Sequence, residues 1–154
     1  MARRPRRELG DGVYHATARG TNRTRIVRDE LDCDAFIRFF ARAAQAWEWA
    51  VHAFCLMPNH YHVVLETKVE RLSNGMHALN WRHAFRFNSR HCRTGHLFQE
   101  RFDARLIETD AYLEEACDYV LNNPVRAGLC NRPDEWPWSG GAAAHWLSRV
   151  ANRP

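Results

Sequence analysis

Two apolar runs, AVHAFCL (50–56) and HYHVVLET (60–67), stand on either side of the tripeptide Met57-Pro58-Asn59. Proline fixes φ and asparagine tolerates turn geometry, so the tripeptide predicts a tight turn. The two runs are therefore predicted to be strands that pair as a hairpin. The rest of the fold is read outward from this hairpin.

The chain on both sides of the hairpin predicts the order β-α-β-β-α-β, followed by one more helix. The predicted elements are a strand at 12–19, an amphipathic helix at 29–49, the hairpin strands, a helix at 71–90, a bent strand at 96–109 and a helix at 111–123. Asp110 is the expected N-cap of the last helix, and Pro124 is expected to end it. This order predicts an α+β, ferredoxin-like sandwich with an antiparallel sheet.

The 154 residues predict a single domain, with a basic tail at 1–10 and a C-terminal tail at 131–154. Trp136 and Trp138 in the latter either stack on unpaired bases or dock the tail on the core. No apolar run approaches the roughly 20 residues of a membrane-spanning helix, and no secretory signal is recognised. The five cysteines lack a CxxC pair, which predicts reduced thiols and a cytoplasmic protein.

The charge balance is basic, with a net charge of +4 and a pI of about 9.0. Every basic residue except Lys68 is arginine, a side chain that suits phosphate contacts and stacking on bases. A genome rich in arginine codons explains the same composition equally well. The composition is therefore compatible with a nucleic-acid partner and does not establish one.

Two histidines, His60 and His62, alternate at the start of the second hairpin strand. Alternate residues of a strand share a face, so the two imidazoles can converge on one metal ion, whereas Tyr61 points to the opposite face. A lone HxH pair is a weak signal. Two half-buried histidines at a strand end remain the plain alternative.

A third metal ligand and a nucleophile are both available on the last predicted helix. Tyr119 and Asn123 are four residues apart and share a helical face. The amide oxygen of Asn123 can bind a hard divalent cation, and a phenol beside that cation can act as a covalent nucleophile. A core tyrosine with a satisfied hydroxyl is the competing interpretation of Tyr119.

Several segments, in this order, resemble the REP-associated tyrosine transposases, which belong to the single-tyrosine HUH endonucleases. The segments are YHATARGTNR, MPNHYHVVLET, FNSRHCRTGHLFQERF, DYVLNNPVRAGL and WPWSG, and the whole match spans residues 12–140. The resemblance implies a ferredoxin-like fold, His60 and His62 as metal ligands, Asn123 as the third ligand and Tyr119 as nucleophile. Tyr61 departs from the family pattern, which usually has an aliphatic residue between the histidines.

The resemblance further implies cleavage and rejoining of single-stranded DNA through a 5′-phosphotyrosine, with Mg²⁺ or Mn²⁺ as cofactor. The implied substrate is an imperfect palindrome folded as a hairpin. Arginines are the expected DNA contacts: Arg3, Arg4, Arg6, Arg7, Arg82, Arg86, Arg90 and, near the scissile phosphate, Arg101. A row of arginines on a helix is equally often a solvated face.

Other functions remain open from the sequence. One is a hairpin-DNA-binding protein without activity, and another is a metal-dependent hydrolase that uses the HxH pair with water as nucleophile. The hydrolase needs further acidic ligands, and only Glu66 lies nearby in the sequence. The DNA target sequence, the choice between monomer and homodimer, and the role in transposing DNA or maintaining repeats are not fixed by the sequence.

Overall fold

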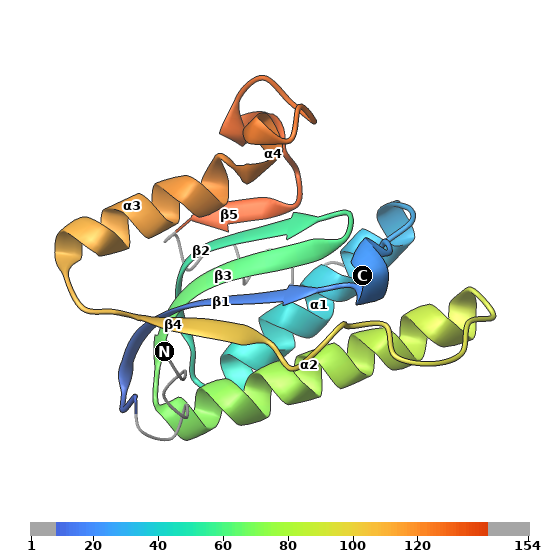
Figure 1. The fold of residues 1–154 in the computed structure, drawn as a ribbon, viewed down its shortest axis with the longest axis horizontal. Coiled ribbons are helices and arrows are strands. Elements are labelled where there is room, and N and C mark those ends of the chain that lie inside the picture. The colour runs from blue at the N-terminus through green and yellow to red at the C-terminus, as the bar shows by residue number, and fades with distance from the viewer. Residues whose placement is uncertain (1–8, 142–154) are drawn as a thin grey trace.

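A computed structural model describes residues 9–141, which form one five-stranded sheet with helices on both faces (Figure 1). The elements in chain order are β1 (Gly12–Arg19), the 3₁₀ turn η2 (Thr21–Arg23), α1 (Glu30–Ala46), β2 (Ala50–Met57), β3 (His60–Thr67), α2 (Val69–Arg90), β4 (Asp103–Ile107), α3 (Asp110–Leu121), α4 (Asn123–Arg126), the 3₁₀ turn η3 (Pro133–Glu135) and β5 (Ser139–Gly141). The strand order is β4-β1-β3-β2-β5, and all neighbours are antiparallel. The predicted ferredoxin-like order is confirmed. No helix among the described residues is long and apolar enough to cross a membrane.

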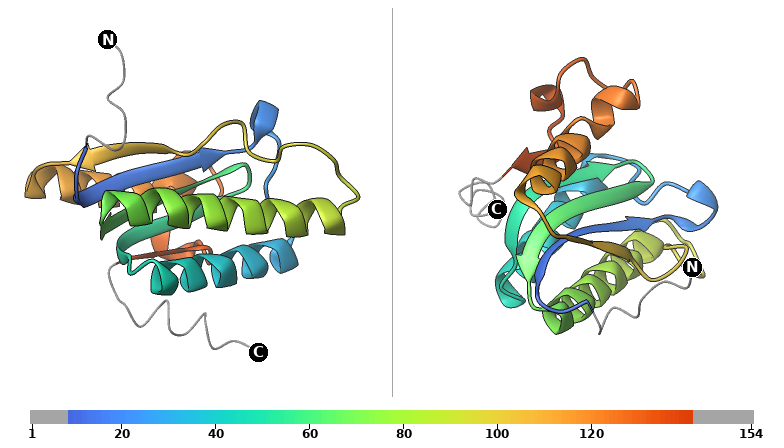
Figure 2. Two further views of the ribbon diagram at one scale, coloured as in Figure 1. Left: turned by 90° about the horizontal axis from the view of Figure 1, so that it is seen from below. Right: turned by 60° about the vertical axis from the view of Figure 1, so that its left-hand side comes forward.

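The sheet separates a large core from a smaller one. Helices α1 and α2 cover one face of the sheet and α3 covers the other (Figure 2). On one face, α1 and α2 contribute buried residues such as Phe36, Phe40 and Met76, which pack with Tyr61 from β3. On the opposite face, α3 packs through Ala116 and Val120. Their apolar residues fall three or four apart along each helix, so each helix buries one stripe against the sheet.

The strand predicted at 96–109 is wrong in its first half. Regular pairing begins only at Asp103, and the preceding segment touches β1 through a single bridge between Gly20 and Phe98. The N-cap of α3 is Thr109, whose hydroxyl accepts a hydrogen bond from the backbone N–H of Tyr112, so the prediction of Asp110 is one residue off. Threonine and aspartate can both cap a helix. Here the backbone is still extended at Thr109 and becomes helical at Asp110, so Thr109 takes the cap position.

The C-terminal tail predicted from residue 131 contains a strand within its described part. Ser139–Gly141 form β5 and pair with β2 at the edge of the sheet. The Trp136 indole N–H donates to the Leu56 carbonyl oxygen at 2.9 Å, and the Leu56 N–H donates to the Trp138 carbonyl oxygen at 2.9 Å. Both tryptophans therefore dock this segment on the core, which confirms the docking alternative.

Candidate active site

The two faces of β3 carry different chemistry, as the alternation predicts. Tyr61 is fully buried on the side of α1 and α2, where its hydroxyl donates to Asn80 Oδ1 at 2.6 Å. His60 and His62 are buried on the face that α3 covers, with exposed fractions of 9% and 7%. Their rings are 5.0 Å apart between centroids and lie nearly perpendicular. Tyr61, the bulky residue between the histidines, therefore does not enter the face on which His60 and His62 lie.

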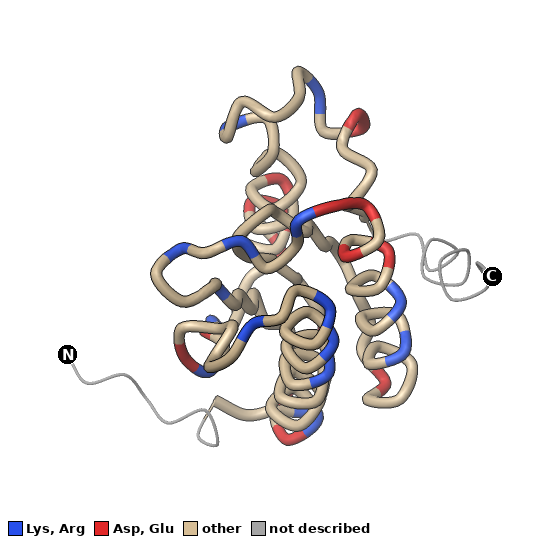
Figure 3. The backbone as a smooth tube through the Cα atoms, turned by 90° about the vertical axis from the view of Figure 1, so that its right-hand side faces the viewer, with Lys and Arg blue, Asp and Glu red and all other residues tan. Residues whose placement is uncertain are grey.

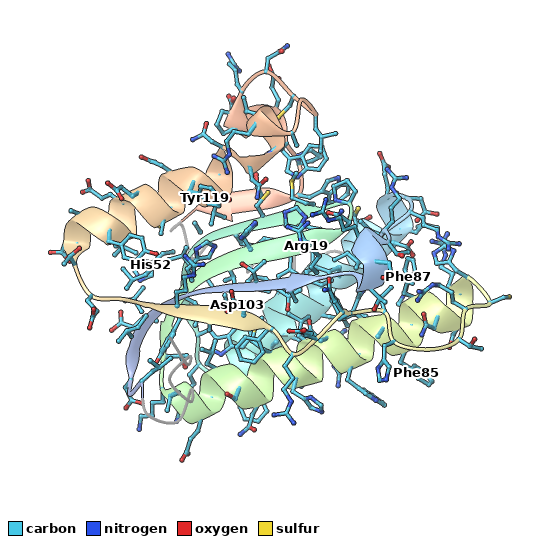
Figure 4. All side chains as sticks on the ribbon, in the orientation of Figure 1. Arg19, His52, Phe85, Phe87, Asp103 and Tyr119 are labelled. Carbon is cyan, nitrogen blue, oxygen red and sulfur yellow. The ribbon has the colours of Figure 1, made fainter. Side chains whose placement is uncertain are left out.

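Tyr119 lies over the sheet near the C-terminal end of α3 (Figure 4). Ala116 and Val120 hold this part of the helix on the sheet, and Tyr119 remains 49% exposed beside the contact. The centroid of its ring is 5.8 Å from that of His62 and 6.1 Å from that of His15. Tyr119 is therefore not a core tyrosine, and its ring is open to solvent next to the histidines.

Asn123 reaches the same place by a different backbone path than predicted. Helix α3 ends at Leu121, and Asn123 begins the short helix α4, in which Pro124 occupies the first turn, where proline is tolerated. The prediction that Asn123 is the last residue of the nucleophile's helix is therefore wrong. The side chain nevertheless lies next to His60, with Asn123 Nδ2 3.5 Å from His60 Nε2.

The hydrogen bonds of both histidines leave Nε2 turned toward the site. His60 Nδ1 is 2.6 Å from Asn59 Oδ1, and His62 Nδ1 is 2.9 Å from His15 Nε2 and 3.0 Å from Thr17 Oγ1. Metal-binding histidines are typically oriented through the ring nitrogen that does not bind the metal. The arrangement therefore fits two Nε2 ligands.

The charge state of the imidazoles fits the same use. Burial lowers the pKa of His60 to about 4, with a further contribution from Arg19. Burial, followed by His60 and His15, lowers the pKa of His62 to about 3. Both rings are thus neutral at physiological pH, which is the form that binds a metal.

The donor set is small. Within residues 9–141 no cluster of three or more His, Cys, Asp or Glu side chains is arranged to bind a metal ion. A site here would rest on two imidazoles and the amide oxygen of Asn123, after a 180° turn of that amide. Such a neutral set would leave coordination positions for water and an anionic oxygen.

Arg126 is a functional candidate that sequence reasoning missed. Its guanidinium carbon lies 4.0 Å from the centroid of the Tyr119 ring, and its Nη2 donates to the Tyr119 carbonyl oxygen at 2.7 Å. The contact joins Arg126, the last residue of α4, to Tyr119 near the end of α3. A positive charge thus lies against the ring of the candidate nucleophile.

His15 was also missed. It precedes Thr17 by two residues on β1, and the antiparallel register sets Thr17 opposite His62. Alternating polar residues in GVYHATAR, matching the alternation in HYHVVLET, are the signal that could have identified this pair. Burial lowers the pKa of His15, and Arg105 lowers it further.

A pocket of about 660 Å³ opens beside Tyr119, between β1, β4 and α3. Its lining includes His15, His62, Arg19, Arg101, Arg105 and Tyr119. Arg101, predicted to lie near a scissile phosphate, therefore shares a pocket with the candidate nucleophile. Glu100, Asp103 and Glu115 line it as well, so three acidic side chains accompany the three arginines.

The arginines predicted on the second long helix lie elsewhere, on the side of α2 that faces α1 (Figure 3). Arg86 and Arg90 pair with the buried carboxylate of Asp32 at 3.3 and 2.7 Å. Arg82 lies over the ring of Phe39 at 5.9 Å. The regular spacing of these arginines is therefore explained by contacts that join α2 to α1. DNA binding by Arg82, Arg86 and Arg90 stays a prediction. Arg3, Arg4, Arg6 and Arg7 lie outside the described residues.

Comparisons with known proteins agree on the class. The family described as "Transposase IS200 like" matches residues 10–123. A solved REP-associated tyrosine transposase bound to a REP hairpin superposes with a TM-score of 0.68 at 18% identity, over 100% of this chain and 89% of that chain. A candidate transposase from Deinococcus radiodurans R1 gives a TM-score of 0.52 at 18% identity, over 73% and 90%.

At these identities the solved structures establish a shared fold. None of the curated proteins matches the chain. The family match covers most of the chain and includes both histidines, Tyr119 and Asn123. The chain therefore belongs to the IS200-like transposase family.

Proposed function

We propose that this protein is a metal-dependent endonuclease and strand transferase that acts on single-stranded DNA at hairpin-forming repeats, through a 5′-phosphotyrosine on Tyr119. The observation that carries the proposal is the position of Tyr119. Its half-exposed ring lies 5.8 Å from His62, over the sheet face that also holds His60, and Asn123 of α4 approaches His60 there. A tyrosine that only filled the core would be buried, whereas this ring is half-exposed beside His62 and His15.

The reaction follows from the chemistry of a phenol beside a phosphodiester. The Tyr119 oxygen attacks phosphorus, the bond from phosphorus to the 3′ oxygen breaks, and the proton lost by the phenol is balanced by one gained by the leaving oxygen. The products are a 5′-phosphotyrosine and a free 3′-OH. A 3′-OH can reverse the step and join strands without ATP, because the covalent bond conserves the energy of the broken one.

His60, His62 and Asn123 would hold the divalent ion, with Mg²⁺ or Mn²⁺ as the proposed cofactor. When bound, such an ion neutralises charge on the phosphate and orients it for in-line attack. Arg101 and Arg105 in the adjoining pocket would bind the DNA backbone, and Arg126 would keep the Tyr119 ring in place. The REP hairpin bound to the structural relative supports a DNA hairpin as the substrate.

The decisive experiment is the covalent adduct. End-labelled hairpin DNA from repeats flanking the gene, incubated with the protein and Mg²⁺ or Mn²⁺, should give a band shifted by the mass of the protein on a denaturing gel. Tyr119→Phe should bind the DNA as the parent does but give no adduct, because it lacks only the oxygen. Tyr112→Phe is the matched control, since Tyr112 lines the same pocket and should be dispensable.

Two outcomes would contradict the proposal. An adduct formed by Tyr119→Phe would mean that another residue is the nucleophile. A parent protein that binds its hairpins without ever forming an adduct would favour the inactive DNA-binding alternative.

The metal is tested separately. Mn²⁺ should raise the melting temperature of the parent, and His60→Ala or His62→Ala should abolish this shift together with adduct formation. His77→Ala, at an exposed position on α2, is the control. Cleavage by the His60, His62 double variant would disprove the ligand assignment.

A further inference from the structure

Asn59 occupies the turn of the β2–β3 hairpin and makes hydrogen bonds on both sides of its amide. Its Oδ1 is 2.6 Å from His60 Nδ1, and its Nδ2 donates to the Arg23 carbonyl oxygen at 3.3 Å. The backbone repeats the connection, because the Gly20 N–H donates to the Asn59 carbonyl at 2.8 Å. The hairpin turn is therefore joined to the turn that follows β1.

These contacts determine which nitrogen of His60 carries the proton. A backbone carbonyl only accepts, so the amide nitrogen of Asn59 must face Arg23 and the amide oxygen must face His60. That oxygen also only accepts, so His60 Nδ1 must donate. The lone pair is left on Nε2, the nitrogen that Asn123 approaches at 3.5 Å.

The Arg23 carbonyl, which accepts from Asn59, belongs to a turn with an unusual backbone. Asn22 and Arg23 have φ angles of 52° and 57°, in the left-handed region that non-glycine residues rarely adopt. A Cβ on Gly20 would lie 2.1 Å from the Thr24 carbonyl oxygen, so the turn closes this tightly only with glycine there. Strained backbone of this kind persists where the surrounding structure over-determines it, often at functional sites.

We propose that Asn59 is a positioning residue: anchored by the Arg23 carbonyl, it holds His60 in the Nδ1–H tautomer with Nε2 directed into the active site. The part that concerns metal binding rests on the proposed function. The tautomer itself does not, since it follows from the hydrogen bonds of the metal-free chain. The turn at Thr21–Arg23 is thereby connected to the candidate metal ligand through one side chain.

The first readout is the tautomer, measured by long-range ¹H–¹⁵N NMR of histidine rings in the full-length, metal-free protein. The parent should show His60 as the Nδ1–H form. Asn59→Ala and the near-isosteric Asn59→Leu remove the acceptor and should shift His60 toward the Nε2–H form. Asn59→Asp keeps the acceptor for His60 Nδ1 but loses the donor to the Arg23 carbonyl, and it should retain the Nδ1–H form of His60. A merely structural role in the turn, which needs that donor, would not predict this.

The second readout is Mn²⁺ affinity, measured by calorimetry. Loss of the partner that orients a metal-binding histidine typically costs 10- to 100-fold in affinity. We expect a loss of about that size for Asn59→Ala and Asn59→Leu and little loss for Asn59→Asp. Asn80→Ala, which breaks the Tyr61 hydrogen bond on the opposite face of β3, is the control that should leave both readouts unchanged.

The outcomes separate the two claims. If His60 stays in the Nδ1–H form in both Asn59→Ala and Asn59→Leu, the positioning role is disproved. If the tautomer shifts but Mn²⁺ affinity does not change, Asn59 positions His60 and the proposed function fails at its ligand assignment.

Discussion

Replacing Arg126 with alanine should slow the attack by Tyr119 far more than it destabilises the fold. The variant loses the guanidinium that lies 4.0 Å from the Tyr119 ring centroid and the 2.7 Å hydrogen bond to the Tyr119 carbonyl. A cation–π contact at an exposed site contributes about 0.5–1 kcal/mol. The exposed hydrogen bond contributes about 1 kcal/mol more. Together these contributions predict a fall in melting temperature of roughly 3–8 °C.

The effect on the reaction should be larger, because nothing else among the described contacts of Tyr119 restrains its half-exposed ring so closely. A displacement of about 1 Å can cost about 100-fold in rate. We therefore expect adduct formation by Arg126→Ala, followed in single turnovers on end-labelled hairpin DNA, to slow by about that factor. The affinity for the DNA should fall by no more than the loss of a single phosphate contact would cause.

Two comparisons make the test specific. Arg126→Lys keeps the charge but not the planar group that stacks on the ring, and it should react at an intermediate rate. Arg42→Ala, at an exposed position on α1, should react as the parent does. An Arg126→Ala protein that forms the adduct at the parental rate would refute the inference that this arginine positions the nucleophile.

Two further predictions concern protons and salt. The pKa values of His62 and His83, lowered mainly by burial to about 3 and about 4, lie below the ordinary value of 6.5. Between these values and pH 6.5 the unfolded chain binds more protons than the folded one, so the stability is fully present above pH 6.5 and is lost as the pH falls. At pH 5 each histidine should lower the free energy of unfolding by about 2 kcal/mol, measured by urea titration of the metal-free protein. An unchanged free energy of unfolding between pH 7 and pH 5 would contradict this. Removing the arginines of the basic tail together, Arg3, Arg4, Arg6 and Arg7, should make log K for binding hairpin DNA less dependent on the logarithm of the salt concentration. An unchanged slope would show that the tail does not touch DNA.

The sequence predicted the part of the molecule in which local pattern and long-range structure agree. The hairpin around Met57-Pro58-Asn59 has a turn signal between two apolar runs, and alternate residues of a strand share a face, so the shared side of His60 and His62 could be read from it. The strand β5 could not, because Ser139–Gly141 has no strand-forming residues and becomes a strand only through pairing with β2. Its existence depends on a neighbour about 85 residues away in the chain.

The part of the site that lies within one predicted helix or strand could be predicted from the sequence. Tyr119 and Asn123 were paired by helical spacing, although the helix breaks between them. The contact of His15 depends on the register between β1 and β3, at which the polar alternation of GVYHATAR only hints, and that of Arg126 depends on the direction of α4 after the break, which leaves no local signal. The arginines of α2 show the reverse case, since a regular spacing that resembles a DNA-binding face also serves ion pairs with a buried carboxylate.

The register of the β2–β3 hairpin has a consequence for reading copies of this gene in genomes. Successive residues of β3 alternate between the core and the site, and β2 already contains a register shift between Val51 and Ala53. Inserting or deleting one codon near the turn would bring Tyr61 toward the active-site face and the histidines toward the core, with almost no change in composition. A related sequence whose length differs by one codon there should therefore lack the site, whereas one that differs only by substitutions can retain it.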